Sequence, residues 1–489
     1  MHALVIGAGF GGIASALRLR AKGYEVTVVE RGTRLGGRAQ TFERNGFRHD
    51  AGPTVITAPF LFEELFALFG EDFSSHVKLV PLTPWYRFHF ADGDHFDYGG
   101  SLEETLIEIK RIDPKDCDGY LKLLDHSKKI FDIAFTDLSA QSFHSFWEMV
   151  KQIPRLVRLK SYKTVWQLVC IYLKHPKLRQ AFSIQPLLVG GNPFDTTSIY
   201  GLIHYLERAY GVHFAMGGTG SIINAFDSLM RRQGIHIELG KTVKSFLTKS
   251  DTVTGAVLDD GQEIYADLVV SNADPAYLYR HMIEPKKVSF TSWFKSNKPK
   301  FSMGLFVLYF GTTKKYPDVA HHTIWLGKRY RKLLKDIFDR TTLSEDFSLY
   351  LHRPTATDPS FAPEGCDSFY VLCPVPNLLG RQVWSTEGPK LSERIIKALD
   401  RTILPHLRET ITEDFYMTPQ DFETNYLSEH GAGFSVAPLF TQSAWFRFHN
   451  RSESLKNLYL VGAGTHPGAG LPGVISSAKV IDSLIAKAA

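Results

Sequence analysis

The sequence predicts an α/β protein in which both ends of the chain build one parallel sheet and the middle of the chain is inserted between them. Two glycine-rich segments, Gly7–Gly12 and Gly462–Gly468, predict this arrangement, because each follows a short apolar strand and precedes a helix. Between them the pattern changes from helical to strand-rich, which predicts further structural units. A chain of 489 residues is also too long for a single hydrophobic core.

The amino-terminal residues predict a β-α-β unit. His2–Ile6 is a short apolar strand, and an amphipathic helix runs from the glycines through Lys22. Gly23 stops this helix, and Glu25–Glu30 supplies a second apolar strand. Two strands joined through a helix in this way begin a parallel sheet.

The middle of the chain predicts a helical segment and a second, mixed sheet. A capping box at Ser101–Glu104 opens a helix, and residues 114–185 have a mostly helical pattern. The strands expected in the second sheet are Tyr86–Phe90, His95–Tyr98, Met303–Phe310, Thr323–Leu326, Phe347–His352 and Ser368–Cys373. Further elements are expected at Ser221–Gln233, Ile235–Leu239, Val253–Leu258, Gln262–Tyr265, Leu268–Ser271, Leu391–Leu407 and Leu458–Val461.

These patterns predict three structural units. The domain with the parallel sheet is expected to be discontinuous, with a mixed-sheet domain inserted into it and a helical subdomain attached. The assigned residues are 1–80, 211–285 and 430–489 for the first unit, 81–113 and 286–429 for the second, and 114–210 for the third.

Composition excludes several protein classes. Hydrophobic residues make up 44% of the chain and charged residues 22%, which is ordinary for a globular protein and argues against a disordered or fibrous one. The four cysteines are scattered without C-x-x-C spacing, so we expect neither a disulfide scaffold nor a metal site, and a reducing compartment fits. We expect no signal peptide and no membrane-spanning helix, because Gly7 interrupts the first apolar run and no uncharged apolar run of about eighteen residues occurs. A net charge of +5 is too mild to indicate a nucleic-acid partner.

The first glycine segment has the G-x-G-x-x-G pattern, formed by Gly7, Gly9 and Gly12. These glycines permit the tight turn after the strand, the approach of a pyrophosphate and close packing of helix on strand. The helix then presents free N–H groups and a positive dipole end to the phosphates. Glu30 closes the second strand at the distance where a carboxylate binds a ribose 2′-hydroxyl and repels a 2′-phosphate. The pattern therefore predicts a dinucleotide site rather than an empty glycine turn.

Three segments indicate FAD rather than NAD. Arg31 begins a loop that contains Gly36, Gly37 and Arg38, where the chain can pass close to a bulky ligand and a guanidinium can face a diphosphate or a flavin edge. His49–Thr54 is another stiff turn of small residues, and the carboxy-terminal glycine turn adds a third run of backbone N–H groups. Three such segments suit a long cofactor that lies extended across the protein.

These residues give the chain a resemblance to the bacterial phytoene desaturases, FAD-dependent carotenoid desaturases within the amine-oxidase-like flavoproteins. The resemblance covers almost the whole chain, and the carboxy-terminal glycine segment is the motif most specific to carotenoid desaturases. The motifs that carry it are Gly7–Gly12, Glu30, Leu35–Arg38, Phe47–Thr54, Leu187–Pro193, Met216–Gly220, Val270–Pro275 and Val461–Gly473. The resemblance implies removal of hydrogens from a C40 polyene, phytoene toward lycopene, with FAD as the only cofactor. C30 desaturases, later-step desaturases and carotenoid cis/trans isomerases share much of this pattern and stay alternatives.

The motifs and the resemblance together give the predicted cofactor contacts. These residues are Gly7, Gly9, Phe10, Gly12, Glu30, Arg31, Gly37, Arg38, Pro53, Thr54, Val243, Gly462, Gly464, Thr465, Gly473 and Val474. Many amine-oxidase-like flavoproteins carry an acid after the last glycines, whereas Thr465 follows Gly464 here, so backbone N–H groups would bind that part of the cofactor. This departure weakens an amine-oxidase interpretation.

A basic, apolar segment predicts contact with a membrane surface. No acidic residue occurs between Glu148 and Asp195, where apolar residues alternate with eight basic ones. The basic residues are Lys151, Arg155, Arg158, Lys160, Lys163, Lys174, Lys177 and Arg179. Such a composition suits amphipathic helices at an anionic interface, although a solvated face of the helical subdomain has the same appearance. We therefore expect a peripheral protein on the cytoplasmic side of the membrane.

The expected chemistry needs a hydride acceptor and a proton acceptor. Hydride transfer to the flavin N5 from a CH₂–CH₂ unit flanked by double bonds leaves an allylic cation, which then loses a proton from the adjacent carbon. Asp50 and His466 are the candidate proton acceptors by position, and a turn cap and a backbone-bonded spacer are their structural alternatives. The electrons must then leave the reduced cofactor to oxygen or a quinone.

The sequence thus predicts a Rossmann-like FAD-binding domain, an inserted mixed-sheet substrate domain and a helical membrane-contact subdomain. From a different class, a lipid carrier with a flavoprotein fold and no redox role is the alternative. It would bind lipid without a flavin.

Overall fold

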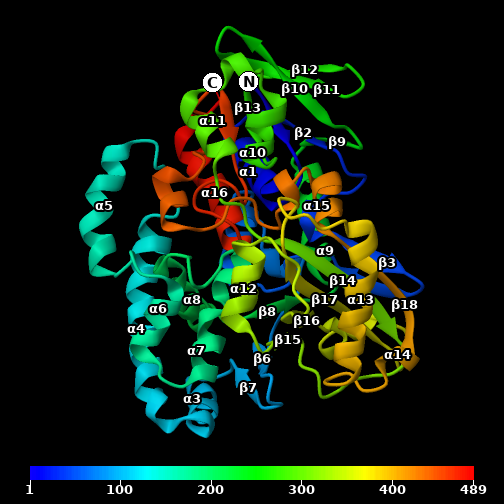
Figure 1. The fold of residues 1–489 in the computed structure, drawn as a ribbon. Helices are drawn as coiled ribbons and strands as arrows, with labels where there is room; N and C mark the ends of the chain where they lie inside the picture. The colour runs from blue at the N-terminus through cyan, green and yellow to red at the C-terminus, as the bar shows by residue number, and fades with distance from the viewer. Residues whose placement is uncertain (489) are drawn as a thin grey trace.

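The computed structural model describes residues 1–488, and in it the two ends of the chain meet in one sheet. Figure 1 shows the amino and carboxy termini side by side, at the strand ends opposite the glycine turns. The sheet has five parallel strands in the order β19-β13-β1-β2-β9. These strands are β19 (Leu458–Leu460), β13 (Leu268–Ser271), β1 (His2–Ile6), β2 (Glu25–Glu30) and β9 (His236–Leu239). The predicted fold class is confirmed.

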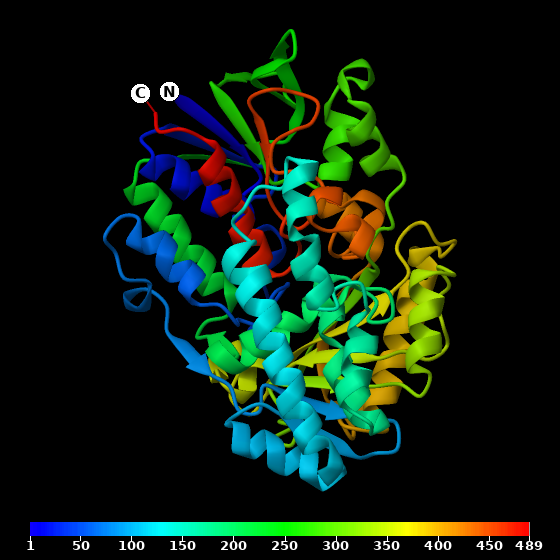
Figure 2. The ribbon, with the colours of Figure 1, turned by 90° about the vertical axis from the view of Figure 1, so that its left-hand side faces the viewer.

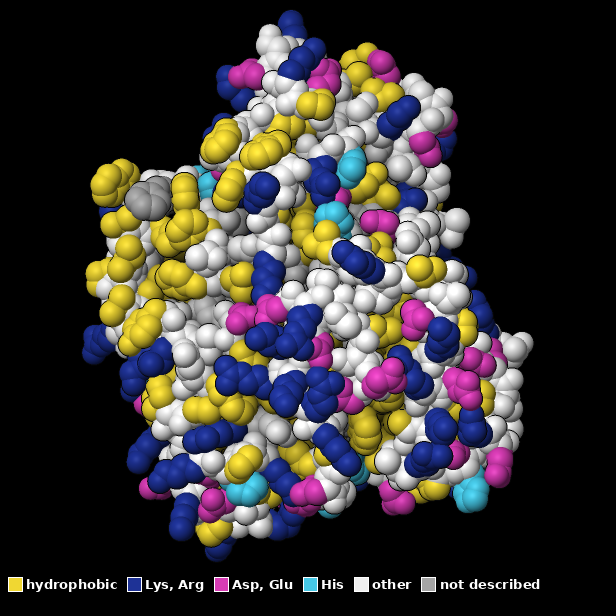
Figure 3. All heavy atoms as spheres, viewed as in Figure 1, with side chains coloured by type: hydrophobic (Ala, Val, Ile, Leu, Met, Phe, Trp, Pro, Cys, Tyr) yellow, Lys and Arg dark blue, Asp and Glu magenta, His cyan; other side chains and the backbone are white. Residues whose placement is uncertain are grey.

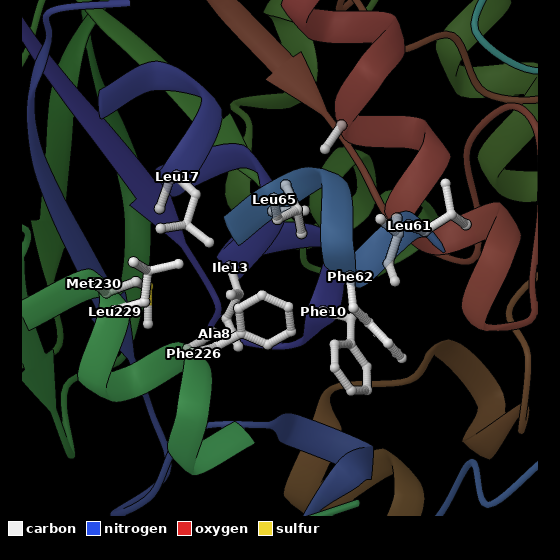
Figure 4. Close-up of a cluster of buried hydrophobic side chains, with 14 of the residues drawn as sticks. Ala8, Phe10, Ile13, Leu17, Leu61, Phe62, Leu65, Phe226, Leu229 and Met230 are labelled. Atoms are coloured by element: carbon white, nitrogen blue, oxygen red, sulfur yellow. The ribbon is translucent and has the colours of Figure 1, made fainter. Parts of the chain in front are cut away.

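The central strands of this sheet are apolar because both of their faces are covered. β13 is buried along its whole length, because helices cover one face of the sheet and strands β10 (Val243–Lys249) and β11 (Thr252–Leu258) pack against the other. The covering helices are α1 (Phe10–Ala21), α2 (Phe60–Ala67), α9 (Thr219–Arg232) and α16 (Leu471–Leu484). Figure 4 shows side chains of α1, α2 and α9 meeting in one core, where the Phe10 ring contacts the rings of Phe62 and Phe226 at centroid distances of 5.7 and 6.4 Å. This packing fixes the first turn of α1, where the glycine motif ends.

The second sheet has seven strands in the order β18-β14-β17-β16-β15-β6-β7. It is mixed, because β15 pairs with β6 in parallel and the other neighbours are antiparallel. The strands are β18 (Ile411–Met417), β14 (Gly304–Thr312), β17 (Asp367–Val375), β16 (Leu349–His352), β15 (His322–Trp325), β6 (Tyr86–His89) and β7 (His95–Tyr98).

The two faces of the second sheet pack against different partners. Along β14, Phe306 and Leu308 join a core with α13 (Trp384–Asp400), whereas Leu305 and Val307 face the other way. This alternation follows from the two-residue period of a strand. The face that carries Leu305 and Val307 is the one that becomes important for the functional site.

Six helices form the helical unit that lies in front in Figure 2. They are α3 (Leu102–Ile112), which the sequence analysis assigned to the mixed-sheet unit, and α4 (Cys117–Phe131), α5 (Phe146–Arg158), α6 (Val165–Tyr172), α7 (Pro176–Ser183) and α8 (Leu202–Tyr210). The predicted capping box is present at α3, where the Ser101 hydroxyl accepts from the Glu104 N–H and the Glu104 carboxylate accepts from the Ser101 N–H. Within residues 1–488, no helix combines the length and the apolar character that crossing a bilayer requires.

Smaller elements connect these units. They are β3 (Thr41–Arg44), β4 (Phe47–Asp50), β5 (Leu79–Pro81), β8 (His213–Ala215), β10 (Val243–Lys249), β11 (Thr252–Leu258), β12 (Glu263–Tyr265), α10 (Pro275–Tyr277), α11 (Phe290–Asn297), α12 (Tyr330–Phe338), α14 (Leu407–Thr410) and α15 (Pro419–Tyr426). The helix expected at residues 391–407 instead begins at Trp384 and ends at Asp400, and α14 is a separate helix. Strand β18 escaped prediction because its sequence carries charged residues at Glu413 and Asp414.

Candidate functional site

A cavity of about 580 Å³ opens among the three units. One end is lined by the turn between β1 and α1, the end of β2 and the carboxy-terminal glycine turn. The other is lined by β14, β16 and β17 of the second sheet and by α5 and α8 of the helical unit. The two ends differ in chemistry, because charged groups and exposed backbone gather at the first, whereas apolar side chains dominate the second.

The glycine motif of the first end presents an uncapped helix. Gly9 is the N-cap residue of α1, and its helix start has no side-chain hydrogen bond, so backbone N–H groups of the first turn remain available to a ligand. Gly7 and Gly9 line the cavity. Gly12 lies behind the wall, where a Cβ atom would come within 1.9 Å of the Gly7 carbonyl oxygen. Gly12 therefore allows the close packing of α1 on β1 that the motif predicts.

Glu30 is held by the backbone at the end of β2. Its Oε2 accepts from the Ala8 N–H at 2.7 Å and its Oε1 accepts from the Gly32 N–H at 2.7 Å. The side chain is buried yet lines the cavity. A carboxylate fixed in this way can still accept further hydrogen bonds, as recognition of a ribose diol requires.

Asn272 joins the two glycine segments. It follows β13, and its N–H donates to the Ile6 carbonyl at 2.8 Å. A Cβ atom added at Gly9 or at Gly462 would come within 2.8 or 2.6 Å of the Asn272 side chain. The amino-terminal and carboxy-terminal turns therefore both need glycine in order to pack against the Asn272 side-chain amide. Asn272 lies in the Val270–Pro275 segment that carries the resemblance, but it was not among the predicted cofactor contacts, although its place at the carboxyl end of a buried parallel strand is a usable signal.

Two buried groups of opposite charge lie beside these turns. Arg38 donates from Nη2 to the Ser428 hydroxyl, and burial lowers the pKa of its guanidinium. Burial raises the pKa of the Asp274 carboxyl, while Ser435 and the Arg38 charge act in the opposite direction. Among the described residues, Arg38 Nε and Asp274 Oδ2 have no hydrogen-bond partner, and both residues line the cavity. Such buried, unpartnered polar atoms fit a polar ligand.

The carboxy-terminal turn is held from behind by Arg447, a residue that the sequence did not single out. Its fully buried guanidinium donates to the Thr465 carbonyl at 3.0 Å and to the Ala463 carbonyl at 2.6 Å. It also donates to the carbonyls of Gln442 and Val436, at 3.2 and 3.3 Å. One side chain thus fixes the turn that faces the cavity.

The predicted cofactor contacts fall into two groups. Those that line the cavity are Gly7, Gly9, Phe10, Glu30, Arg31, Gly37, Arg38, Pro53, Thr54, Val243, Gly462, Gly464, Gly473 and Val474. Gly12 and Thr465 lie behind the wall. Thr465 departs from the expected placement because its buried hydroxyl donates to the Gly462 carbonyl at 3.0 Å and so closes the turn from within.

The two candidate proton acceptors also differ in placement. Asp50 is fully buried away from the cavity, where its Oδ1 accepts from the N–H and the hydroxyl of Thr219 at 3.0 and 2.9 Å. Burial raises its pKa to about 6, and the bonds from Thr219 oppose that rise. Asp50 therefore caps α9, as its structural alternative predicts. The catalytic expectation for Asp50 has no support in this position.

His466 lines the cavity. Burial lowers the pKa of its imidazole to about 4, so the ring is neutral at pH 7. Its Nε2 lies 3.2 Å from the Leu138 carbonyl, and with the proton on Nε2 the Nδ1 lone pair is left without a partner among the described residues. This geometry leaves a weak base at the cavity wall.

The polar end of the cavity fits FAD. An uncapped helix start, a fixed carboxylate at the end of β2, two glycine turns closed on one amide, and unpartnered atoms of Arg38 and Asp274 meet the needs of a pyrophosphate, a ribose and a polar ring edge. These groups come from segments far apart in the chain, as an extended cofactor requires.

Comparison with known proteins agrees with this geometry. The family model described as "Flavin containing amine oxidoreductase" matches residues 10–480. The chain is 45% identical over 482 residues to "Phytoene desaturase (lycopene-forming)" of Pantoea ananas, covering 98% of each chain. It is 42% identical over 490 residues to "Phytoene desaturase (neurosporene-forming)" of Rhodobacter capsulatus, covering 99% of this chain and 94% of the relative. Among solved structures, an oxidoreductase from Methanosarcina mazei aligns with a TM-score of 0.66 at 16% identity, over 99% of this chain and 100% of the other, which shows a shared fold.

The Glu30 carboxylate should contribute to flavin affinity. We expect Glu30→Gln to raise the dissociation constant of FAD about tenfold, because a charge-assisted hydrogen bond contributes about 1.5 kcal/mol more than its neutral replacement. The measurement is a fluorescence titration of the flavin-free protein with FAD. Glu238→Gln on the neighbouring strand β9 is the matched control, and equal affinities of the two variants would contradict the assignment.

Arg447 should be a main determinant of stability. Arg447→Met leaves four buried carbonyl groups without their donor, and we expect a loss of about 3 kcal/mol in the free energy of unfolding. Thermal unfolding should show this as a midpoint lower by several degrees, together with weaker retention of FAD. Arg451→Met removes an exposed arginine nearby and should leave the midpoint unchanged.

Proposed function

The chain belongs to the flavin containing amine oxidoreductase family, and on that premise we propose that it is an FAD-dependent desaturase that converts phytoene toward lycopene. The observation that carries this proposal is the apolar end of the cavity. A neutral polyene needs a long, dry, apolar space beside the flavin, and an amine or amino-acid substrate needs a charged or aromatic-caged one.

The walls of the apolar end have this character. Leu305 and Val307 of β14 and Ile324 of β15 form part of the floor, and Leu156 of α5 and Leu206 of α8 form part of the roof. These side chains offer dispersion contacts along a hydrocarbon without fixing a polar group. The two relatives are named for the same substrate and for different products, lycopene and neurosporene, so we propose that the cavity of this chain decides which product it forms.

FAD, when bound, supplies the acceptor for the hydride that leaves the substrate. The protein supplies position, dryness and electrostatics. Gly7, Gly9 and Glu30 hold the nucleotide half in place, and the turn braced by Arg447 fixes the wall beside the apolar end. Leu305, Val307 and Leu156 exclude water from the substrate carbons, so that the developing positive charge is not quenched by solvent.

The substrate dissolves in lipid, and one face of the protein suits a bilayer surface. Figure 3 shows apolar side chains gathered over α5 and α11 on the same side of the molecule. On α5, Trp147 is 71% exposed and Val157 is 55% exposed, whereas Met149 and Leu156 of the same helix line the cavity. Helix α5 is therefore apolar toward the solvent as well as toward the cavity.

Helix α11 extends this surface. Phe290, Trp293 and Phe294 are exposed on it, and basic residues flank the apolar ones on α5. The exposed basic residues of α5 are Lys151, Arg155 and Arg158. Aromatic and aliphatic side chains bordered by Lys and Arg favour the interface of an anionic leaflet, with about 1 kcal/mol for each basic residue near the surface. We propose peripheral attachment on the cytoplasmic side through α5 and α11, with oxygen or a membrane quinone as electron acceptor.

Activity is tested by incubating the purified, FAD-loaded protein with phytoene in liposomes, in air and with a quinone under nitrogen. We expect products that absorb at progressively longer wavelength as conjugated double bonds are added. A product with changed double-bond geometry and an unchanged number of double bonds would indicate an isomerase. Unchanged phytoene under both conditions would contradict desaturation, and a colourless protein that retains lipid would indicate a carrier.

Attachment is tested by replacing three exposed apolar residues of α5 together, Trp147→Gln, Ile153→Gln and Val157→Gln. We expect the partition coefficient onto anionic liposomes to fall at least about tenfold, because these side chains lose apolar area that would enter the interface. Flotation measures this, and flavin absorbance verifies that the variant is folded. The control replaces exposed apolar residues elsewhere, Ile107→Gln, Leu379→Gln and Val383→Gln. Equal flotation of the two variants would contradict the assigned surface.

A further inference from the structure

A single carboxyl group lies in the wall of the apolar end of the cavity. Glu207, on α8, is fully buried and lines the cavity beside Leu206. Its Oε1 accepts from the Tyr86 hydroxyl at 2.9 Å, whereas its Oε2 has no hydrogen-bond partner among the described residues. A buried carboxyl oxygen without a partner is costly, and nothing in a hydrocarbon substrate binds it in the ground state.

The neighbouring arginine, Arg208, does not form an ion pair with Glu207. Arg208 donates to the Gly100 carbonyl at 2.7 Å and to the Thr105 hydroxyl at 2.8 Å, and its guanidinium lies over the Trp85 ring at 4.5 Å. The described residues include no ion pair with Glu207. The carboxyl group is therefore not part of a structural salt bridge, the usual reason for a buried acid.

A series of side-chain contacts joins this wall to a predicted cofactor contact. The Tyr86 ring packs against the His322 ring at 5.9 Å, and the Tyr350 hydroxyl lies 2.8 Å from His322 Nδ1. Tyr350 in turn contacts the Thr54 hydroxyl at 3.0 Å, and Thr54 is one of the predicted cofactor contacts that line the cavity. Glu207 is thus linked through Tyr86, His322 and Tyr350 to Thr54, and both Glu207 and Thr54 line the same cavity.

We propose that Glu207 is a catalytic residue of the desaturation, the carboxylate that accepts the substrate proton. This inference rests on the proposed function. In the step, one substrate carbon loses a hydride to the flavin, and the adjacent carbon loses a proton to Oε2 of Glu207. The electron pair of that second C–H bond becomes the π bond of the new double bond, and the carboxylate becomes a neutral carboxyl. Tyr86 holds Oε1, and Oε2 keeps its lone pairs available for the proton.

The surroundings give the acceptor a useful basicity. Burial raises the pKa of Glu207 to about 8, against the opposing effects of Tyr86, Arg208 and Tyr98. Tyr98 from β7 and Tyr120 from α4 also lie near it, and burial raises the pKa of both phenols, so they stay neutral. Burial lowers the pKa of His322, behind Tyr86, to about 3, so this ring is neutral as well. Among these groups, Glu207 is the one that titrates near neutral pH, and its basic form becomes more abundant as pH rises through about 8.

Glu207→Gln is the direct test, in liposomes that contain phytoene between pH 6 and 9.5. For the unaltered protein we expect kcat to rise with pH and to level off above about 8. The variant should lose about 100-fold in kcat at pH 8.5 and should lose the rising limb, while FAD absorbance and KM stay unchanged. Glu207→Asp should recover part of the rate, because a carboxylate is restored at a longer distance.

Three further variants separate this role from others. Tyr86→Phe removes the hydrogen bond that stabilises the carboxylate, so the rising limb should move to higher pH. His466→Gln should leave the limb in place, which separates the two acceptors. Glu413→Gln is the matched control, since it removes another buried glutamate, bonded to His49 at 3.2 Å and outside the cavity wall. Its pH profile should equal that of the unaltered protein.

The outcomes are distinct. If Glu207→Gln is active and its kcat rises with pH as in the unaltered protein, the role of Glu207 is overturned and the proposed function stays intact. An unaltered protein without any desaturase activity would remove the proposed function itself. If Glu207→Gln does not retain FAD, the pH profile of Tyr86→Phe provides the test. A rise of kcat at the same pH as in the unaltered protein would then overturn the inference.

Discussion

The site depends on the parallel pairing of three strands, β19, β13 and β1, whose carboxyl ends lie at one edge of a sheet. This pairing brings the turn after Ile6 and the turn after Leu460 to the same place, although more than four hundred residues separate them. Asn272, at the end of the strand between them, fills the space that the glycines leave. A larger residue at either turn would push the backbone of the turn away from the Asn272 side chain. The two turns would then no longer enclose the predicted pyrophosphate site. Every later feature of the cavity is positioned relative to this junction.

A second principle is the separation of polar from apolar chemistry within one cavity. The polar groups at the nucleotide end are held by backbone and buried partners, as Glu30 is by two N–H groups and the carboxy-terminal turn is by Arg447. The other end is lined mainly by side chains without charge. A buried carboxyl group such as Glu207 is therefore unusual at this end, because its burial destabilises the fold and no ion pair offsets that destabilisation. Asp50 differs from Glu207 in this respect. Its burial is offset by the hydrogen bonds that it accepts from Thr219, through which it caps α9.

Sequence patterns predicted the sheet, the glycine cradle and most of the second sheet, since these depend on local periodicity and on glycine spacing. The helix starting after Gly9 and the capping box at Ser101 are local features of the same kind. Arg447 and Glu207 escaped prediction, and Asn272 was part of a quoted motif without an assigned role, because the significance of all three comes from contacts across long sequence separation. Arg447 carries no motif, and its four carbonyl partners become visible only in three dimensions. Strand β18 was missed because Glu413 and Asp414 break the apolar pattern, although pairing with β14 supplies the backbone bonds that a strand needs.

The position of β19 and α16 in the chain has a consequence for biosynthesis. The second turn of the cradle and the helix that covers it are synthesised more than four hundred residues after the first turn, and Lys22, after α1, donates to the carbonyl of Ile485 at 2.6 Å. Until β19 and α16 have been synthesised, the nascent chain has one half of its nucleotide site, and β13 is the edge strand of the sheet. The complete site therefore forms only after α16 has been made, and a polypeptide without β19 and α16 would lack half of it.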